Sequence, residues 1–589
     1  DDEEDREQQP TMAHFAPIPN PPEQEYESFA TAEKELISFS RRHGFELAKC
    51  GNLEKGPAGA ILRRPFRCSK GNQDNSARYR AQRDAAGLQP QRNKPSKLTG
   101  CPFTVTIGAV EKNNSEGPYK IALGKNPTHN HPGVNPIGLA NHRRADRMKI
   151  REFLRNARDS QIEPRKVCGM AKREFHARYS NDEEGEMVAP VLRDIYNEWA
   201  KIRSETLQGA TPVERTMEIL EQEGFFHRSR IGNDSRIEAL FFAHPRIIEI
   251  FKENPDVVIV DCTYKTNNYG LPLLCFVTIT RVGIAMPVAH AFLHAEHEAA
   301  YTWALGCFQD MIDQHHIEEP SVIVHDRDRA LIRGLEGVFP AIPHLLCLWH
   351  MHEDVKANVN ATFGMTRLPE GRWVVSQQGE EFLAGYNSCI QAKTVDEFWI
   401  ACNALGNKHG DSQWQKMVRY LEVQWWPHKE LCVTAWTDNI RHYGTSTTSI
   451  VEGSHASLKH WLQSSRNDLL RFVKKLEGFY DHHVSRYQNS LARAQNQGVA
   501  PFIQSTFYSM TVRVINTRGL RLVEQQRRLA IQDATERRMH PERQFNHPPC
   551  SRRWRSTMGL PCKHELATFV EDESHVVQRS LFDPHWVIP

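Results

Sequence analysis

The stretch Asp256-Val257-Val258-Ile259-Val260-Asp261-Cys262-Thr263 sets the fold expected for the centre of this chain. Its four consecutive aliphatic residues, 257–260, predict a buried strand that runs into Asp261. Turns rich in Asn and Gly then separate further apolar runs. The elements expected after the first strand are strands over 271–281, 284–293, 321–324 and 344–348, and helices over 296–315 and 329–338. Hairpins followed by strand–helix–strand units indicate a mixed sheet with helices on its faces.

The composition of the 589 residues narrows the class of protein. The chain is long enough for about four domains. With 39% hydrophobic and 25% charged residues, these domains can have substantial cores. Lys and Arg number 74 against 72 Asp and Glu, so any argument for a nucleic-acid partner must be local. No apolar run reaches the length of a membrane-spanning helix. The acidic start, 1–6, is unlike a signal peptide, and 13 cysteines without one indicate thiols or metal ligands in a reducing compartment.

Acidic residues follow two of the predicted strands. Asp261 and Asp326 each stand where an apolar run stops, and carboxylates at adjacent strand ends can hold a pair of divalent cations. Such a site needs a third carboxylate, for which Glu452 at the start of a predicted helix is the candidate. The alternative is that an Asp after a strand is a turn residue or a helix cap. Asp328 competes for the second position, but Asp326 follows its strand directly and is preferred.

Two Cys/His groups have the composition of zinc sites. Cys68, Cys101, His129 and His131 give C-x32-C-x27-H-x-H, two thiolates and two imidazoles. Near the C-terminus, the spacing gives a second candidate set, H-x2-C-x11-C-x-H, formed by His547, Cys550, Cys562 and His564.

Basic residues concentrate in two regions. Between residues 63 and 97 ten Arg and Lys stand against two Asp, which suits contacts to DNA phosphates and guanine edges, or simply a solvated loop. These ten are Arg63, Arg64, Arg67, Lys70, Arg78, Arg80, Arg83, Arg92, Lys94 and Lys97. The second region, 141–178, is either a DNA-contacting helical element or the polar face of helices that pack on a core.

Four motifs in order make the centre of the chain recognisable. It resembles the Mutator-like (MULE) family of cut-and-paste DNA transposases through Asp261-Cys262-Thr263-Tyr264-Lys265-Thr266-Asn267, His325-Asp326-Arg327-Asp328-Arg329-Ala330-Leu331, Cys347-Leu348-Trp349-His350 and Val451-Glu452-Gly453-Ser454-His455. The resemblance implies an RNase H-like fold with an all-α insertion, and a DDE site of Asp261, Asp326 and Glu452 that binds Mg2+ or Mn2+. It also implies a DNA-positioning or structural role for the family's C-x-x-H element, here Cys347 and His350.

The two Cys/His groups resemble modules found beside such cores. The N-terminal quartet is similar to the FAR1-type, WRKY–GCM1-like zinc domain, which implies a zinc-bound β-sheet that contacts DNA. The C-terminal group resembles a SWIM-type zinc finger in which Arg552 stands at the position of the second Cys. Such a finger is either degenerate and metal-free or completed by another residue, for which His547 is the candidate.

The expected organisation is a multidomain α/β protein. Its parts are an acidic and Pro-rich arm over 1–25, the zinc domain over 26–135, a helical linker over 136–235, the core over 236–350, a helical insertion over 351–445, the rest of the core over 446–530 and the finger over 540–570.

The resemblance implies an enzyme that cuts and joins double-stranded DNA. A DNA transposase of this kind would bind terminal inverted repeats, act at least as a dimer and work in the nucleus. The alternative is a domesticated FAR1-like transcription regulator without catalysis. The presence of all three acidic residues favours the enzyme. A zinc-stabilised interaction scaffold would explain the Cys/His clusters but not the triad.

Overall fold

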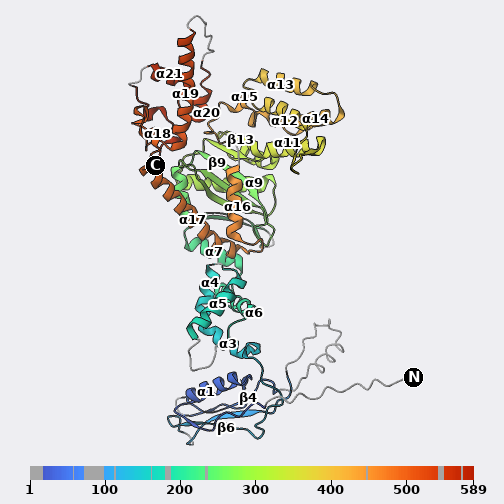
Figure 1. Cartoon of the computed structure of the whole chain (residues 1–589), viewed down its shortest axis with the longest axis vertical. Coiled ribbons are helices and arrows are strands. Elements are labelled where there is room, and N and C mark those ends of the chain that lie inside the picture. Colours follow the sequence, from blue (N-terminus) through green and yellow to red (C-terminus); the bar gives the residue numbers. More distant parts are fainter. Residues whose placement is uncertain are drawn as a thin grey trace, which may run out of the picture. The chain divides into compact units, whose positions relative to one another are not determined.

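The computed structural model divides into two compact units, Asp1–Gly209 and Ala210–Pro589 (Figure 1). It describes residues 17–56, 59–71, 98–111, 114–160, 162–179, 188–232, 236–445, 449–540, 550–571 and 575–589. The expected arm over 1–25 therefore lies largely outside the described residues. No helix in these ranges is long and apolar enough to cross a membrane.

An antiparallel sheet forms the first half of the N-terminal unit. Its strands run in the order β1-β6-β5-β4-β2, and β3 also pairs with β4. The bounds are β1 Glu25–Tyr26, β2 Leu47–Lys49, β3 Glu54–Lys55, β4 Ile61–Cys68, β5 Thr104–Ala109 and β6 Tyr119–Leu123. Helix α1 (Phe29–Arg42) packs on β5 and β6, and alternate residues such as Val105 and Ile107 face it and are fully buried. The other face of the sheet is open to solvent at Thr104 and Lys120.

Helices complete this unit. They are α3 (Ala140–Lys149), α4 (Arg151–Asp159), α5 (Pro164–Tyr179) and α6 (Leu192–Leu207). Apolar residues such as Leu154, Val167 and Ile195 form a small core between α4, α5 and α6. This unit is therefore β-rich at first and helical afterwards.

A seven-stranded mixed sheet lies at the centre of the second unit, in the order β13-β12-β9-β10-β11-β8-β7. The bounds are β7 Phe226–Ile231, β8 Ile237–Ala243, β9 Val257–Thr263, β10 Leu273–Ile279, β11 Ala285–Leu293, β12 Val322–His325 and β13 His344–Leu346. In the spatial order of the sheet, the neighbouring strands β7, β8, β11, β10 and β9 are antiparallel, whereas β12 is parallel to both β9 and β13. The sheet already begins at Phe226, ahead of the expected start at 236, because the polar strand β7 pairs with the apolar β8.

Helices cover both faces of this sheet. On one face, α9 (Glu298–Gln314) stacks Phe308 on Phe276, with a ring-centroid distance of 4.6 Å. On the other, α17 (Leu469–Asn496) places Phe472 4.8 Å from Phe292, and α16 (Ser449–Leu462) contacts β9 and β11. The short helix α10 (Arg329–Val338) joins the parallel strands β12 and β13. Helix α7 (Pro212–Gln222) packs against α17, and α8 (Pro245–Glu253) precedes β9.

A second, largely helical core follows β13. Its helices are α11 (Leu348–Phe363), α12 (Gln377–Ile390), α13 (Val395–Asn407), α14 (Ser412–Gln424) and α15 (Thr434–Thr437). Trp414, Trp425 and Phe382 are fully buried there. The all-helical expectation for 351–445 needs a correction, because β14 (Met365–Arg367) and β15 (Trp373–Val375) form a hairpin. Each strand has three residues, too few for an alternating pattern to show.

The C-terminal part of the chain is helical and returns to the sheet. It contains α18 (Ala500–Ile503), α19 (Thr517–Met539), α20 (Arg553–Met558) and α21 (Lys563–Glu571). The buried ring of His585 forms a hydrogen bond between its Nδ1 and Asp256 Oδ2, 3.1 Å away, at the start of β9.

Candidate functional site

Two carboxylates stand at the ends of adjacent parallel strands. Val260 on β9 pairs with His325 on β12, so the next residues in register are Asp261 and Asp326. Asp261 is 4% exposed. The two acids that each follow an apolar run in the sequence therefore lie at neighbouring positions at one edge of the sheet.

Asp326 occupies a poorly solvated position. Burial raises the pKa of its carboxyl to about 6, the nearby His350 ring opposes this, and the charges of Asp328 and Glu296 add to it. A cation would relieve the cost of ionising this group. The competing candidate, Asp328, instead caps α10, since its Oδ1 accepts hydrogen bonds from the backbone N–H groups of Ala330 and Leu331 at 2.7 and 2.9 Å.

The C-x-x-H element lies beside Asp326. Cys347 donates its backbone N–H to the carbonyl oxygen of His325 at 2.7 Å, which attaches the start of α11 to the end of β12. The Cys347 Sγ accepts from the backbone N–H of His350 at 3.4 Å and caps the helix. This cap orients the first turn of α11. His350 in that turn lowers the pKa of Asp326 and so opposes the effect of burial.

Helix α16 brings a further side chain to the same strand. His455 on α16 lies with Nδ1 3.6 Å from Oδ2 of Asp261, and both side chains are buried. Glu452, the third predicted acid, belongs to the first turn of α16, three residues before His455. The backbone of α16 therefore places Glu452 on the helix that reaches Asp261, while its side chain lies outside the described residues.

Glu296 is a functional candidate that sequence reasoning missed. Its Oε1 accepts hydrogen bonds from the hydroxyl groups of Tyr264 at 2.6 Å and Tyr301 at 3.3 Å. Its charge also contributes to the raised pKa of Asp326. The available signal was the one used for the aspartates, an acid shortly after an apolar strand, since Glu296 follows the end of β11 at Leu293.

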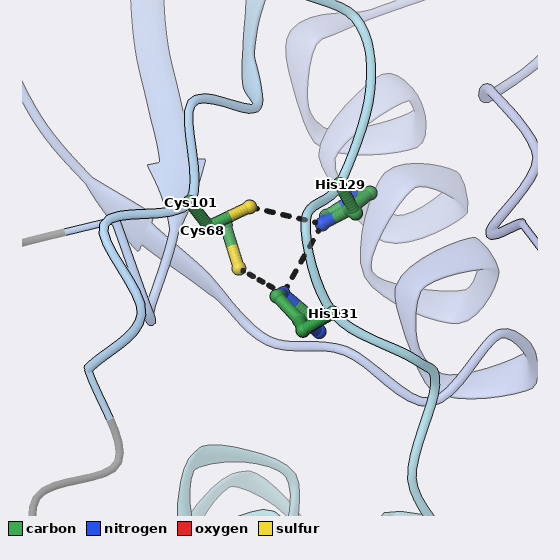
Figure 2. Close-up of side chains that lie close together, drawn as sticks. All are labelled: Cys68, Cys101, His129 and His131. Atoms are coloured by element: carbon green, nitrogen blue, oxygen red, sulfur yellow. Dashed lines mark hydrogen bonds between the residues drawn. The ribbon is translucent and has the colours of Figure 1, made fainter. Parts of the chain in front are cut away.

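The N-terminal Cys/His quartet converges on one point (Figure 2). Cys68 Sγ lies 3.2 Å from His131 Nε2, Cys101 Sγ lies 3.4 Å from His129 Nδ1, and the two imidazole nitrogens are 3.4 Å apart. A tetrahedral zinc ion with bonds of about 2.3 Å to sulfur and about 2.05 Å to nitrogen requires edges of about 3.3 to 3.8 Å. The four donor atoms therefore fit a tetrahedral ion.

The surroundings of the quartet favour neutral imidazoles, the form that ligates metals. Burial lowers the pKa of His129 to about 4, and its ring stacks on Phe103 with a centroid distance of 4.0 Å. His131 Nδ1 lies 2.9 Å from the carbonyl oxygen of Pro132 and donates to it, which leaves the Nε2 lone pair for the metal. Burial raises the pKa of Cys68 to about 12, so its thiolate needs a positive partner.

The open face of the N-terminal sheet carries part of the predicted DNA-binding set. Side chains alternate along β4, so Arg63 and Arg67 lie on the opposite face of the sheet from Phe66 and Cys68. Across the sheet, Lys120 is in register with Arg63 through Gly108 of β5. Of the other predicted residues, Arg64 is on β4 and Lys70 follows it, whereas Arg78, Arg80, Arg83, Arg92, Lys94 and Lys97 lie outside the described residues.

Several arginines of the second basic region are paired with acids of their own unit. Arg143 lies 2.8 Å from Asp194, while Arg147 and Arg151 lie 2.9 and 2.7 Å from Glu198, which is buried on α6. The helices α3 and α4 thus use these arginines to pack on α6. The geometry therefore supports the interpretation that this region is the polar face of packed helices.

The C-terminal cluster gathers three donors. Cys550 Sγ lies 3.6 Å from Cys562 Sγ, which lies 3.9 Å from His564 Nδ1. Arg552 is the N-cap residue of α20. The predicted fourth ligand, His547, lies outside the described residues. The three donors form a partial tetrahedral set that a fourth would complete.

Residues 257–354, which contain both aspartates and the C-x-x-H element, match the family model described as the MULE transposase domain. The chain is a MULE/FAR1-like protein. Its similarity to FAR1-RELATED SEQUENCE 5 of Arabidopsis thaliana is 22% identity, covering 71% of this chain and 51% of the relative. FAR-RED IMPAIRED RESPONSE 1 from the same plant is 26% identical over 39% of this chain and 25% of its own length.

The MULE/FAR1-like chain also resembles a fungal protein. The PKS-NRPS hybrid synthetase cheA of Chaetomium globosum is 21% identical over 78% of the chain, which covers 10% of that synthetase. The chain thus spans about half the length of one of these relatives and a smaller fraction of the other two.

Proposed function

We propose that this MULE/FAR1-like chain is a DNA transposase that cuts and joins double-stranded DNA at terminal inverted repeats. The observation that carries the proposal is the register of β9 and β12, which makes Asp261 and Asp326 neighbours at one sheet edge. The strand order β11-β10-β9-β12-β13, three antiparallel strands followed by two parallel ones, supports an RNase H-like core. The proposed enzyme acts as a dimer or higher oligomer in the nucleus.

In this proposal Asp261, Asp326 and Glu452 hold Mg2+ or Mn2+, which supplies activation of water and stabilisation of the leaving oxygen. The low solvation of Asp326 suits a metal ligand, because its carboxylate is costly without a cation. His455 orients Asp261 from α16. Tyr264 and Tyr301 fix the carboxylate of Glu296 beside this centre through hydrogen bonds.

The quartet of Cys68, Cys101, His129 and His131 is proposed to hold a structural Zn2+. Four protein donors leave no open position, as in structural rather than catalytic zinc sites. The ion would join the end of β4 to the H-x-H segment, and so hold the sheet whose open face carries Arg63, Arg67 and Lys120 against DNA. A second zinc ion is proposed on Cys550, Cys562, His564 and His547, from the three donors that the structure assembles.

A FAR1-like transcription regulator is the second candidate. Two of the three relatives described above are FAR1 proteins, and the similarity to one of them extends over 71% of this chain. Such a protein would keep the zinc-bound sheet and bind specific DNA without cutting it.

One experiment separates the two. The purified protein is incubated with Mg2+ or Mn2+ and a labelled duplex that carries the element's own terminal repeat. Cleavage at the repeat end by the wild type, abolished in Asp261→Asn, Asp326→Asn and Glu452→Gln with binding retained, would support the transposase. The matched control is Asp328→Asn, which keeps a good helix cap and should keep the cleavage. Specific binding without cleavage by the wild type would favour the regulator.

A further inference from the structure

A cavity of about 360 Å3 opens in the second unit, in the size range of small-ligand sites. Four segments line it: the β10–β11 turn, the last turns of α17, the start of α19, and His585 with Trp586. Among the residues that the structure describes, the lining includes Arg281, Arg493 and Arg518 but no Asp or Glu. A cavity that collects three guanidinium groups and no acid has the electrostatic character of an anion site.

These arginines have few partners. Arg281 Nε lies 3.8 Å from Asp256 Oδ2, and within the described part of the chain this buried nitrogen makes no hydrogen bond. Asp256 is shared, since the same oxygen lies 3.1 Å from His585 Nδ1. Arg518 donates to the backbone carbonyl of Tyr443 at 3.3 Å, and neither it nor Arg493 forms an ion pair among the residues that the structure describes. The positive charge at the cavity is therefore only partly compensated.

We propose that this cavity binds a phosphate group. Guanidinium groups match phosphate oxygens in geometry and form charge-assisted hydrogen bonds with them. The site is distinct from the carboxylate centre. Asp256 directly precedes β9 and Asp261 lies five residues further along the chain, so these two residues are about 17 Å apart at roughly 3.3 Å per residue. The phosphate belongs either to a free phosphorylated compound or to the DNA backbone, away from the reacting bond.

The test compares two substitutions on the same helix. Arg493→Gln removes a cavity arginine, and Arg486→Gln removes an exposed arginine of α17 that does not line the cavity. Both side chains are exposed, so neither change should unfold the protein. Binding of sodium pyrophosphate is measured by titration calorimetry in buffer without divalent cations, which leaves the carboxylate centre out of the measurement.

The expected result is that Arg493→Gln weakens pyrophosphate binding roughly tenfold, the loss of one charged hydrogen-bonding partner, while Arg486→Gln does not. A second arm measures affinity for a DNA duplex against salt concentration. If the phosphate is that of DNA, Arg493→Gln lowers the duplex affinity and reduces the salt slope by about one. Equal behaviour of the two variants toward both ligands would overturn the proposal, whether or not the protein cleaves DNA.

Discussion

His455 Nδ1 on α16 lies 3.6 Å from Asp261 Oδ2 on β9, so a residue that follows the helical region in the chain contacts the first carboxylate. Both side chains are buried, and α16 packs on β9 and β11. The contact holds the helix that contains Glu452 against the strand that contains Asp261.

Replacing His455 should therefore weaken the proposed reaction. Loss of a residue that orients a metal ligand typically lowers metal affinity or activity by roughly 10- to 100-fold. We expect His455→Ala to reduce metal-dependent cleavage by that order, with duplex binding retained. His460→Ala, an exposed histidine on the same helix, is the control, and an equal loss in both variants would refute the role of His455.

Removing Asp326's charge should stabilise the metal-free protein at neutral pH. Burial raises the pKa of Asp326 to about 6, so between its ordinary pKa and 6 the folded state binds more protons than the unfolded state, and stability falls as pH rises. The penalty is fully present above pH 6 and amounts to at most about 3 kcal/mol for two pKa units. We expect Asp326→Asn to raise the melting temperature of chelator-treated protein at pH 7 but not at pH 4. A constant difference across this range would contradict the interpretation.

The quartet predicts a zinc-dependent N-terminal unit. Structural zinc contributes roughly 10 kcal/mol or more to folding small zinc domains. Cys101→Ser should therefore lose one equivalent of zinc, measured by elemental analysis, and lower the melting temperature of this unit. Cys50→Ser changes a cysteine outside the cluster and should retain the ion. Unchanged zinc content in Cys101→Ser would count against the site.

The open face of the N-terminal sheet should provide phosphate contacts. Substituting Ala for Arg67, which unlike Arg63 has no acidic partner among the described residues, should reduce the slope of log affinity against log salt by about one, at roughly 0.9 per phosphate contact. Arg155→Ala is the matched control from the second basic region, because Arg155 already lies 3.5 Å from Glu205. The prediction fails if Arg67→Ala leaves the slope at the wild-type value, or if Arg155→Ala reduces it by the same amount.

The buried ion pair between Arg41 and Asp146 should contribute far more to the stability of the protein than the exposed pair between Arg42 and Glu35. Its atoms are 3.0 Å apart, its side chains are 10% and 2% exposed, and Asp146 also accepts from the backbone N–H of Val188. Removing one partner of a buried pair costs about 3–5 kcal/mol. Arg41→Met should lower the unfolding free energy by that order, measured by denaturant titration. Arg42→Met is the control: the exposed pair between Arg42 and Glu35 is worth about 1 kcal/mol or less, so this variant should keep nearly the wild-type unfolding free energy.

Local patterns in the sequence predicted much of the central sheet. The helix expected over 329–338 is α10, and the apolar runs before Asp261 and Asp326 form adjacent strands. In contrast, the sequence predicts a helical linker where β7 lies, because four of the six β7 side chains are exposed and only its pairing with β8 makes it a strand.

The site was predicted less completely than the sheet. Acids after strands identified Asp261 and Asp326, and the cap made by Asp328 is a local contact that the helix expected over 329–338 already allowed. The tyrosine hydrogen bonds to Glu296 depend on atoms that only the fold brings together. The acidic partners of Arg143 and Arg147 lie about fifty residues away on α6. A count of basic residues cannot show whether distant acids neutralise them.

The position of α16 in the chain has a consequence for how the protein is made. Strands β9–β13 are complete by residue 346, but α16 begins only at Ser449, after the helical core of α11–α15. During synthesis the sheet therefore emerges and can pair well before His455 exists to reach Asp261. Closing this long-range contact is a late and slow step. A ribosome-bound or truncated chain would thus carry both aspartates without α16, and the proposed cleavage would have to wait until the polypeptide has passed residue 462.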